Sequence, residues 1–220
     1  MATISSTILL TGFAPFNQET TNPSWQAVKR FEGKTTSDGS QIHVAELPCE
    51  FGRAIEVLQH LIQQKRADIV ICVGQAGGRS EINVERIAIN VDDARIPDNA
   101  GQQPIDEPIE ANGENAYFST LPIKAIVQQI RQAGIPAHVS QSAGTYVCNH
   151  VFYGLMHYAK QHPFIRRAGF IHIPYLPEQA VNHAGAPSMS LENLLKSLSI
   201  TLEVCTQHGE DLKLSEGSIC

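Results

Sequence analysis

Continuous apolar runs recur along the chain and predict the strands of a buried sheet. Runs of this kind, rich in β-branched residues, are typical of parallel strands that are covered on both faces. Five segments have this character, namely 7–11, 42–47, 69–73, 136–140 and 169–173.

Between these runs the apolar residues follow a helical spacing. Segment 51–66 places Phe51, Ala54, Ile55, Leu58, Leu61 and Ile62 on one face, and segments 122–133, 147–160 and 188–204 also favour helices. The alternation predicts one α/β domain over residues 1–205. Its fold should be a mostly parallel twisted sheet with helices on both faces, similar to phosphorylases and hydrolases.

Three segments depart from this alternation. Residues 86–91 alternate in polarity, which predicts an extra strand in an antiparallel extension outside the parallel core. Residues 92–115 are rich in Pro, Gly, Asp and Asn without periodicity, so we expect a long functional loop or an interface arm. Residues 206–220 are polar, and we expect a mobile C-terminal tail.

Composition excludes several classes of protein. Sixteen Lys and Arg against 22 Asp and Glu give a net charge of −6 without a basic stripe, which argues against nucleic-acid partners. The short apolar run 8–10 follows no basic residue, so we expect neither a secretory signal nor a membrane partner, and a cytoplasmic location. Five cysteines without a C-x-x-C pair argue against a disulfide framework and a zinc ribbon. At least one thiol is then free.

Cys148 is the strongest candidate nucleophile. The small residues 142–144 lead into the helix predicted from residue 147, so Cys148 lies at the helix start. Unpaired N–H groups and the dipole there favour the thiolate and could hold an oxyanion. A buried structural role suits Cys72 better, because it lies inside an apolar strand. Cys49, at a second helix start, is the alternative nucleophile.

His172 and Glu85 are candidates for partners of that thiol. His172 ends an apolar strand, where a histidine is more often an ordinary core residue, but a thiol needs a base of near-neutral pKa. His150 and His157 are competitors on the helix of Cys148, although neither should reach back to its start. Glu85 taken alone could be a solvated charge. No H-E-x-x-H or comparable spacing occurs, so no metal is expected.

Two loops after strands allow other interpretations. The glycine-rich turn 74–79 could cradle a phosphate, but its spacing matches neither the dinucleotide nor the Walker pattern. Phe13 and Phe16 follow the first strand beside Gly and Pro, which favours a loop, although both could be core residues.

Several motifs, in order, resemble the pyroglutamyl-peptidase I family, also called pyrrolidone-carboxylate peptidases. They are GFAPFNQETTNPS, GQAGGRSEINVERIAIN, ARIPDNAG, SQSAGTYVCNHVFYGLMH and HIPYLPEQ, and the likeness covers about residues 8–202. The resemblance implies a cysteine peptidase that removes N-terminal pyroglutamate from peptides through a thioester. It places the family's catalytic residues on Glu85, Cys148 and His172.

The resemblance also implies a binding pocket. Phe13 and Phe16 would hold the lactam ring, with polar groups from Asn22 and Gln75, and Arg95 would assist the oxyanion. It implies no cofactor and a homo-oligomer, either a dimer or a tetramer. The chain departs from the family pattern at Asn83, where Ser or Thr is usual, and at residues 17–18, where glycine is usual; we expect tuning of activity.

Two rival functions are consistent with the same residues. A nucleoside phosphorylase-like or phosphate-binding protein would use the turn 74–78 and would tolerate thiol alkylation. A catalytically inactive relative would bind pyroglutamyl peptides without turnover.

Overall fold

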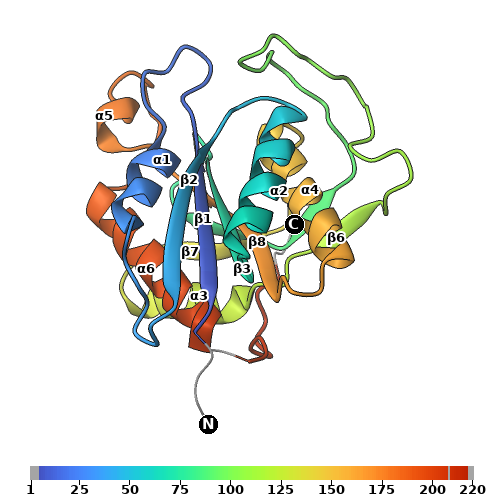
Figure 1. Ribbon diagram of the computed structural model, residues 1–220. Coiled ribbons are helices and arrows are strands. Elements are labelled where there is room, and N and C mark those ends of the chain that lie inside the picture. The colour runs from blue at the N-terminus through green and yellow to red at the C-terminus, as the bar shows by residue number, and fades with distance from the viewer. Residues whose placement is uncertain (1–4, 208, 218–220) are drawn as a thin grey trace.

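A six-stranded sheet forms the centre of the protein, in a computed structural model that describes residues 5–207 and 209–217 (Figure 1). The order across the sheet is β2-β1-β3-β8-β4-β7. The four strands β2, β1, β3 and β8 run parallel, whereas β4 is antiparallel to β8 and parallel to β7. The strands are β1 (Thr7–Phe13), β2 (Gln41–Leu47), β3 (Ile69–Gln75), β4 (Ile82–Glu85), β7 (Ala137–Ser140) and β8 (Arg167–Ile173).

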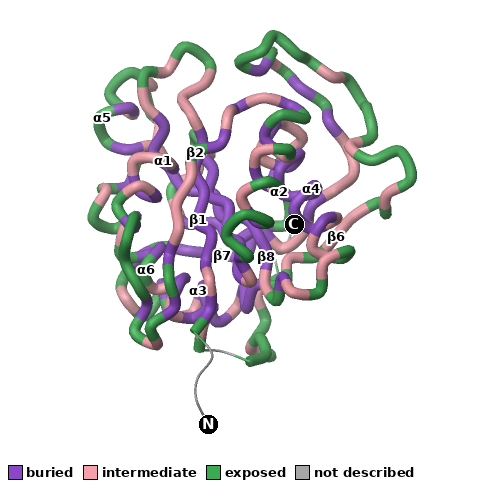
Figure 2. Tube along the Cα trace, viewed as in Figure 1, coloured by how far each residue is buried: buried purple, intermediate pink, exposed green. Residues whose placement is uncertain are grey.

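Helices cover both faces of this sheet and enclose two apolar cores. One core lies under α2 (Arg53–Lys65) and α4 (Val147–Gln161). The other lies under α1 (Pro23–Val28), η1 (Lys29–Phe31), α3 (Ile123–Gln132) and α6 (Leu191–Gln207). Figure 2 shows buried strands at the centre and exposed residues on the outer sides of the helices and in the loops. The short α5 (Pro177–Ala180) follows β8.

All five predicted strands and all four predicted helices are present. The extra strand expected at 86–91 is also found, as β5 (Ile87–Ile89), which pairs antiparallel with β6 (Ala116–Phe118) in a separate two-stranded sheet. The sequence analysis missed β4 and β6, the short α1 and α5, and the reversed direction of β7 relative to β8. No helix in the described part of the chain has the length and apolarity needed to span a membrane.

The described part of the C-terminal segment packs on α3. Helix α6 continues to Gln207, beyond the predicted boundary at 205. In the described residues 209–217, Asp211 accepts hydrogen bonds from backbone N–H groups in the first turn of α3, at Lys124 and Ala125. Glu216 forms a 2.7 Å ion pair with Arg131. The mobility of the tail stays a prediction, and residues 208 and 218–220 lie outside the described residues.

Candidate active site

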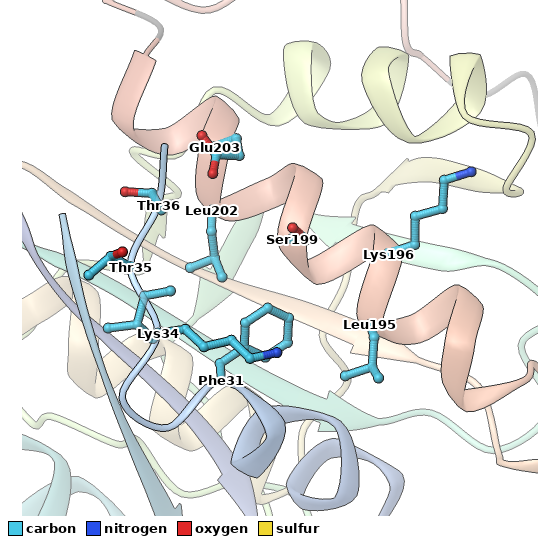
Figure 3. A pocket seen from close by; sticks show the side chains of 10 residues that line it. Phe31, Lys34, Thr35, Thr36, Leu195, Lys196, Ser199, Leu202 and Glu203 are labelled. Atoms are coloured by element: carbon cyan, nitrogen blue, oxygen red, sulfur yellow. The ribbon is translucent and has the colours of Figure 1, made fainter. Parts of the chain in front are cut away.

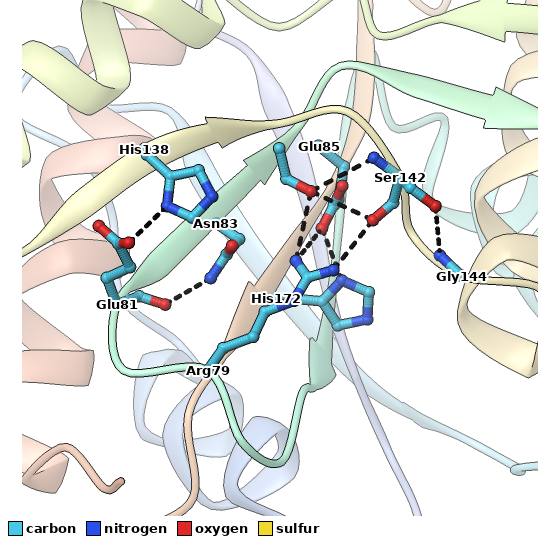
Figure 4. Close-up of polar contacts among 9 residues, drawn as sticks. Arg79, Glu81, Asn83, Glu85, His138, Ser142, Gly144 and His172 are labelled. Atoms are coloured by element: carbon cyan, nitrogen blue, oxygen red, sulfur yellow. Dashed lines mark hydrogen bonds and ion pairs between the residues drawn. The ribbon is translucent and has the colours of Figure 1, made fainter. Parts of the chain in front are cut away.

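Glu85 and His172 meet because β4 lies antiparallel beside β8. Asn83 pairs with His172 across the two strands, so Glu85 lies diagonally opposite His172 on the same face of the sheet. Its Oε1 accepts a hydrogen bond from His172 Nδ1 at 2.8 Å (Figure 4). Both side chains are buried. The hydrogen-bonding distance predicted from the sequence is therefore found, and Glu85 is not a solvated charge.

Cys148 reaches the same face from the start of α4. It is the second residue of a helix whose N-cap is Tyr146, so its backbone N–H is among those that lack a helical partner. Its sulfur lies over Gly74, where an added methyl group would come within 2.8 Å of both Sγ and the Phe170 ring. Gly74 pairs with His172 between β3 and β8. The thiol and the imidazole therefore lie over neighbouring strand positions.

The surroundings of Cys148 oppose ionisation of its thiol. Burial raises the pKa of Cys148 well above its usual value, and the nearby Cys49 and Glu85 raise it further, while Arg79 lowers it. The helix N-terminus contributes about 0.3–1 kcal/mol, less than one pKa unit, whereas burial can shift a pKa by about 3–5 units. Burial is therefore the larger effect, and it opposes the thiolate that the helix start favours.

A narrow cavity opens beside Cys148. It is lined by all four predicted pocket residues together with the candidate nucleophile and two further residues: Phe13, Phe16, Asn22, Cys49, Gln75, Tyr146 and Cys148. Phe13 belongs to the end of β1 and is buried against Phe170, whereas Phe16 is half-buried and faces Tyr146. The structure thus brings residues from four separate loops and strand ends to one small, mostly apolar space.

The amide groups at the cavity are oriented by their neighbours. Asn22 Oδ1 accepts from Ser24 N–H and Oγ–H, because Asn22 caps α1, and its Nδ2 donates to Ala14 O. Gln75 Oε1 accepts from Nε2 of the buried Gln179 at 3.1 Å. With the oxygens engaged in this way, Asn22 and Gln75 can offer N–H donors to a ligand.

The loop 92–115 packs beside this cavity. Tyr146 O–H donates to Pro97 O at 3.1 Å, and Asn99 Nδ2 donates to Pro15 O at 2.9 Å. The loop therefore lies next to the start of α4 and to the loop after β1, and is not remote from Cys148. Arg95 itself is exposed. Its proximity to an oxyanion stays a prediction.

The two competing histidines form hydrogen bonds with other residues, and the competing cysteine is buried. His150 Nδ1 bonds Asp92 Oδ2 at 2.7 Å, and its Nε2 accepts from the Gly52 N–H at 2.8 Å. His157 bonds Tyr117 through Nδ1 and Gln161 through Nε2. Burial raises the pKa of Cys49 to about 12. Neither histidine is free to serve as a base for Cys148.

The glycine-rich turn is explained by close packing. Gly74 lies under Cys148, and an added Cβ at Gly77 would clash with the Tyr175 ring. Gly78 adopts a φ of +90°, which favours glycine. Arg79, which follows, points to Glu85 (Figure 4). These contacts account for the glycines without a phosphate.

A separate cavity between η1 and α6 lacks comparable chemistry. Figure 3 shows its walls, which include Phe31, Lys34, Leu202 and Glu203. Among the described residues, no histidine or cysteine lines it. In the part of the chain that the structure describes, no group of His, Cys, Asp and Glu side chains is arranged to hold a metal ion.

Sequence reasoning missed three residues of the site. Tyr146 lines the cavity, Gln179 orients Gln75, and Arg79 bonds Glu85. Arg79 and Tyr146 both lie within motifs that carry the family resemblance, two to six residues from a predicted site residue. Gln179 ends the motif HIPYLPEQ, but its role depends on α5, which was not predicted.

Comparisons with known proteins agree on one family. The family described as "Pyroglutamyl peptidase" matches residues 6–208. A pyrrolidone-carboxylate peptidase of Chromobacterium violaceum is 55% identical over 213 residues, covering 97% of this chain and 99% of that protein. One from Brevibacillus brevis is 54% identical, with the same coverage.

Solved structures give the same result. The pyroglutamyl peptidase I of Bacillus amyloliquefaciens superposes with a TM-score of 0.93 at 49% identity, covering 96% of this chain and 100% of that one. A mutant pyrrolidone carboxyl peptidase of Pyrococcus furiosus gives 0.88 at 44% identity, covering 90% and 97%. The similarity therefore extends over nearly the whole chain.

Proposed function

Because the chain belongs to the pyroglutamyl peptidase family, we propose that it is a cysteine peptidase that hydrolyses the bond after an N-terminal pyroglutamyl residue. In this proposal Cys148 is the nucleophile, His172 is the acid/base, and Glu85 is the carboxylate that orients His172. One observation carries the assignment of these residues. The half-buried thiol of Cys148 lines a narrow cavity at a helix start and lies over Gly74, the residue that pairs with His172. The Nδ1 atom of His172 bonds the buried carboxylate of Glu85.

The reaction begins with a neutral thiol, because burial raises the pKa of Cys148. His172 Nε2 takes the thiol proton as sulfur attacks the carbonyl that links the ring to the next residue. The imidazolium then gives this proton to the departing amine, which leaves a pyroglutamyl thioester on Cys148. Water, deprotonated by His172, cleaves the thioester and restores the thiol. Glu85 keeps the Nδ1 proton of His172 in place throughout.

The developing oxyanion needs donors at the carbonyl oxygen. The Cys148 backbone N–H is a suitable one, because it lies at the second position of α4 and has no helical acceptor. We assign the Arg95 guanidinium as a second donor, supported by the packing of the loop 92–115 beside Tyr146.

The cavity would recognise pyroglutamate through its lactam ring, which carries no charge. The cavity residues carry no carboxylate or ammonium group, so a substrate with an ionised N-terminus would lose hydration without gaining a partner, which costs several kcal/mol. Phe13 and Phe16 provide apolar contact for the flat ring. The N–H groups of Asn22 and Gln75 can donate to the lactam carbonyl.

We further propose that the protein acts in the cytoplasm as a homo-oligomer, a dimer or a tetramer. The four cysteines that the structure describes form no disulfide, which agrees with a reducing compartment. Ile105 in the loop 92–115 and Phe118 on β6 are large apolar residues that are about two-thirds exposed, at 70% and 66%, which suits contact between copies.

Hydrolysis of a chromogenic pyroglutamyl amide tests the function. The protein should release the chromophore, should lose this activity after iodoacetamide, and should not require phosphate. Cys148→Ser should lose nearly all hydrolysis while keeping its thermal midpoint. Cys49→Ser, at the second cavity cysteine, should stay active. Full activity in Cys148→Ser would refute the nucleophile, and absence of hydrolysis in the unmodified protein would refute the function.

A further inference from the structure

The carboxylate of Glu85 is shared between two partners. Its Oε1 accepts from His172 Nδ1 and from Arg79 Nη1, both at 2.8 Å (Figure 4). Glu85 is fully buried, and its Oε2 has no hydrogen-bond partner among the described residues. A buried carboxylate is strongly unfavourable without a compensating charge. A neutral His172 supplies a hydrogen bond but no charge, so the compensating charge comes from Arg79.

The Arg79 guanidinium also contacts the chain that leads to the nucleophile. Nη1 lies 3.3 Å from Ser140 Oγ at the end of β7, and Nη2 donates to Ser142 O at 3.0 Å. Segment 141–146 connects this point to α4 and Cys148. One side chain thus joins Glu85 on β4 to the segment before Cys148. About one-third of the Arg79 side chain is exposed.

We propose that Arg79 is a positioning residue of the peptidase reaction: it keeps Glu85 ionised for His172 and fixes the segment that carries Cys148. The inference rests on the proposed function. Arg79 acts through Glu85 and the loop, and does not line the cavity beside Cys148. Its positive charge also lowers the pKa of Cys148, against the larger effect of burial.

Replacing Arg79 with methionine tests this role through the pH profile. The variant removes a positive charge that lies 2.8 Å from Glu85, so the acid limb of kcat/KM should move to higher pH. We expect a shift of about one unit and an about tenfold lower kcat at neutral pH, which recovers at alkaline pH. KM should change little. Arg79→Lys should restore the acid limb but only part of kcat, because one ammonium cannot make all three contacts.

Arg131→Met is the matched control, since it removes an arginine of α3 that forms a 2.7 Å ion pair with Glu216 in the C-terminal segment. It should leave the pH profile unchanged. A loss of activity in Arg79→Met that is equal at every pH, with a lowered thermal midpoint, would mean a merely structural role and would overturn the proposal. An unchanged profile with full activity would overturn it as well.

A double-mutant cycle separates action through Glu85 from an independent effect. In the Glu85→Gln background there is no charge to compensate, so adding Arg79→Met should lower kcat/KM by clearly less than it does in the unmodified protein. The loss that remains would come from the contact with Ser142 O. A repeat of the full loss in that background would contradict the proposal. The effect of Arg79 on Cys148 can also be measured if the protein does not hydrolyse pyroglutamyl amides. Alkylation of Cys148 by iodoacetamide should then be slower in Arg79→Met than in the unmodified protein at the same pH.

Discussion

Two of the histidine–carboxylate pairs in the described part of the chain are buried, and each is associated with a cysteine at the same cavity. His172 Nδ1 lies 2.8 Å from Glu85, and His150 Nδ1 lies 2.7 Å from Asp92. All four residues are buried, and in both pairs the second carboxylate oxygen has no partner among the described residues. Cys148 lines the cavity near the first pair, and Cys49 also lines it, three residues before the Gly52 that bonds His150.

The second ring nitrogen distinguishes the two pairs. His150 Nε2 accepts the Gly52 N–H at 2.8 Å, so this imidazole has no lone pair left for a proton. Within the described residues, no hydrogen bond is made to Nε2 of His172. Cys49 is also almost fully buried, whereas Cys148 is partly exposed. A histidine–carboxylate pair is therefore insufficient evidence for a base, because catalysis requires an unoccupied nitrogen beside an accessible thiol.

Replacing each histidine with glutamine tests this comparison and should produce the largest effect. His172→Gln should lower kcat by roughly 10²–10⁴-fold, the usual contribution of general acid–base catalysis. Its loss of stability should be the smaller of the two, because Glu85 keeps its ion pair with Arg79. His150→Gln should keep kcat within about threefold, because it removes no reacting group. It should instead lower the free energy of unfolding by about 1–3 kcal/mol, since buried Asp92 loses its partner.

Steady-state hydrolysis and thermal unfolding on the same preparations give both quantities. For a chain of this size each kcal/mol corresponds to about 2–4 °C in the thermal midpoint. Loss of kcat in His150→Gln at an unchanged thermal midpoint would show that His150, and not His172, is the base.

Alkylation of the two cysteines sharpens the comparison further. Burial raises the pKa of both thiols, that of Cys49 to about 12. Below a thiol pKa the reactive thiolate increases about tenfold per pH unit, so inactivation by iodoacetamide should accelerate from pH 7 through pH 9. Peptide mapping should find the label on Cys148 and not on Cys49. A rate that levels off near pH 7 would show that His172 and Cys148 form an ion pair in the resting protein.

Truncation of the cavity wall should have a smaller effect. Phe16 is half-buried, so Phe16→Ala should remove contact with the ring and raise KM by about tenfold, within the roughly 1–3 kcal/mol expected for an aromatic contact, with a smaller fall in kcat. Phe13 is buried against Phe170, so Phe13→Ala should also lower the thermal midpoint. An unchanged KM in folded Phe16→Ala would remove it from the pocket.

Much of the fold was predictable because the parallel strands are continuously apolar. Strand β4 was not predictable in this way, because Asn83 and Glu85 give its sequence the alternating polarity of a half-exposed strand. All four of its residues are nevertheless buried. Glu85 is buried there because it bonds His172 and Arg79. The polar composition of residues 209–217 likewise did not predict that Asp211 caps α3.

The site was predictable where residue chemistry and position agree. Cys148 at a helix start and His172 at a strand end could be proposed from their places in the chain. Glu85, by contrast, was assigned through the family resemblance, because nothing local predicts that β4 turns antiparallel beside β8. Arg79 was interpreted as part of a possible phosphate turn, since its contact with Glu85 depends on the same pairing.

The covalent intermediate is the most direct test of the central claim, that Cys148 with His172 cleaves pyroglutamyl peptides through a thioester. The protein would be mixed with excess chromogenic pyroglutamyl amide, quenched with acid within one turnover, and analysed by mass spectrometry and peptide mapping. We predict a pyroglutamyl group on Cys148, strongly reduced in His172→Gln and retained in His150→Gln. A pyroglutamyl group on Cys49, or on Cys148 to the same extent in His172→Gln, would contradict the account.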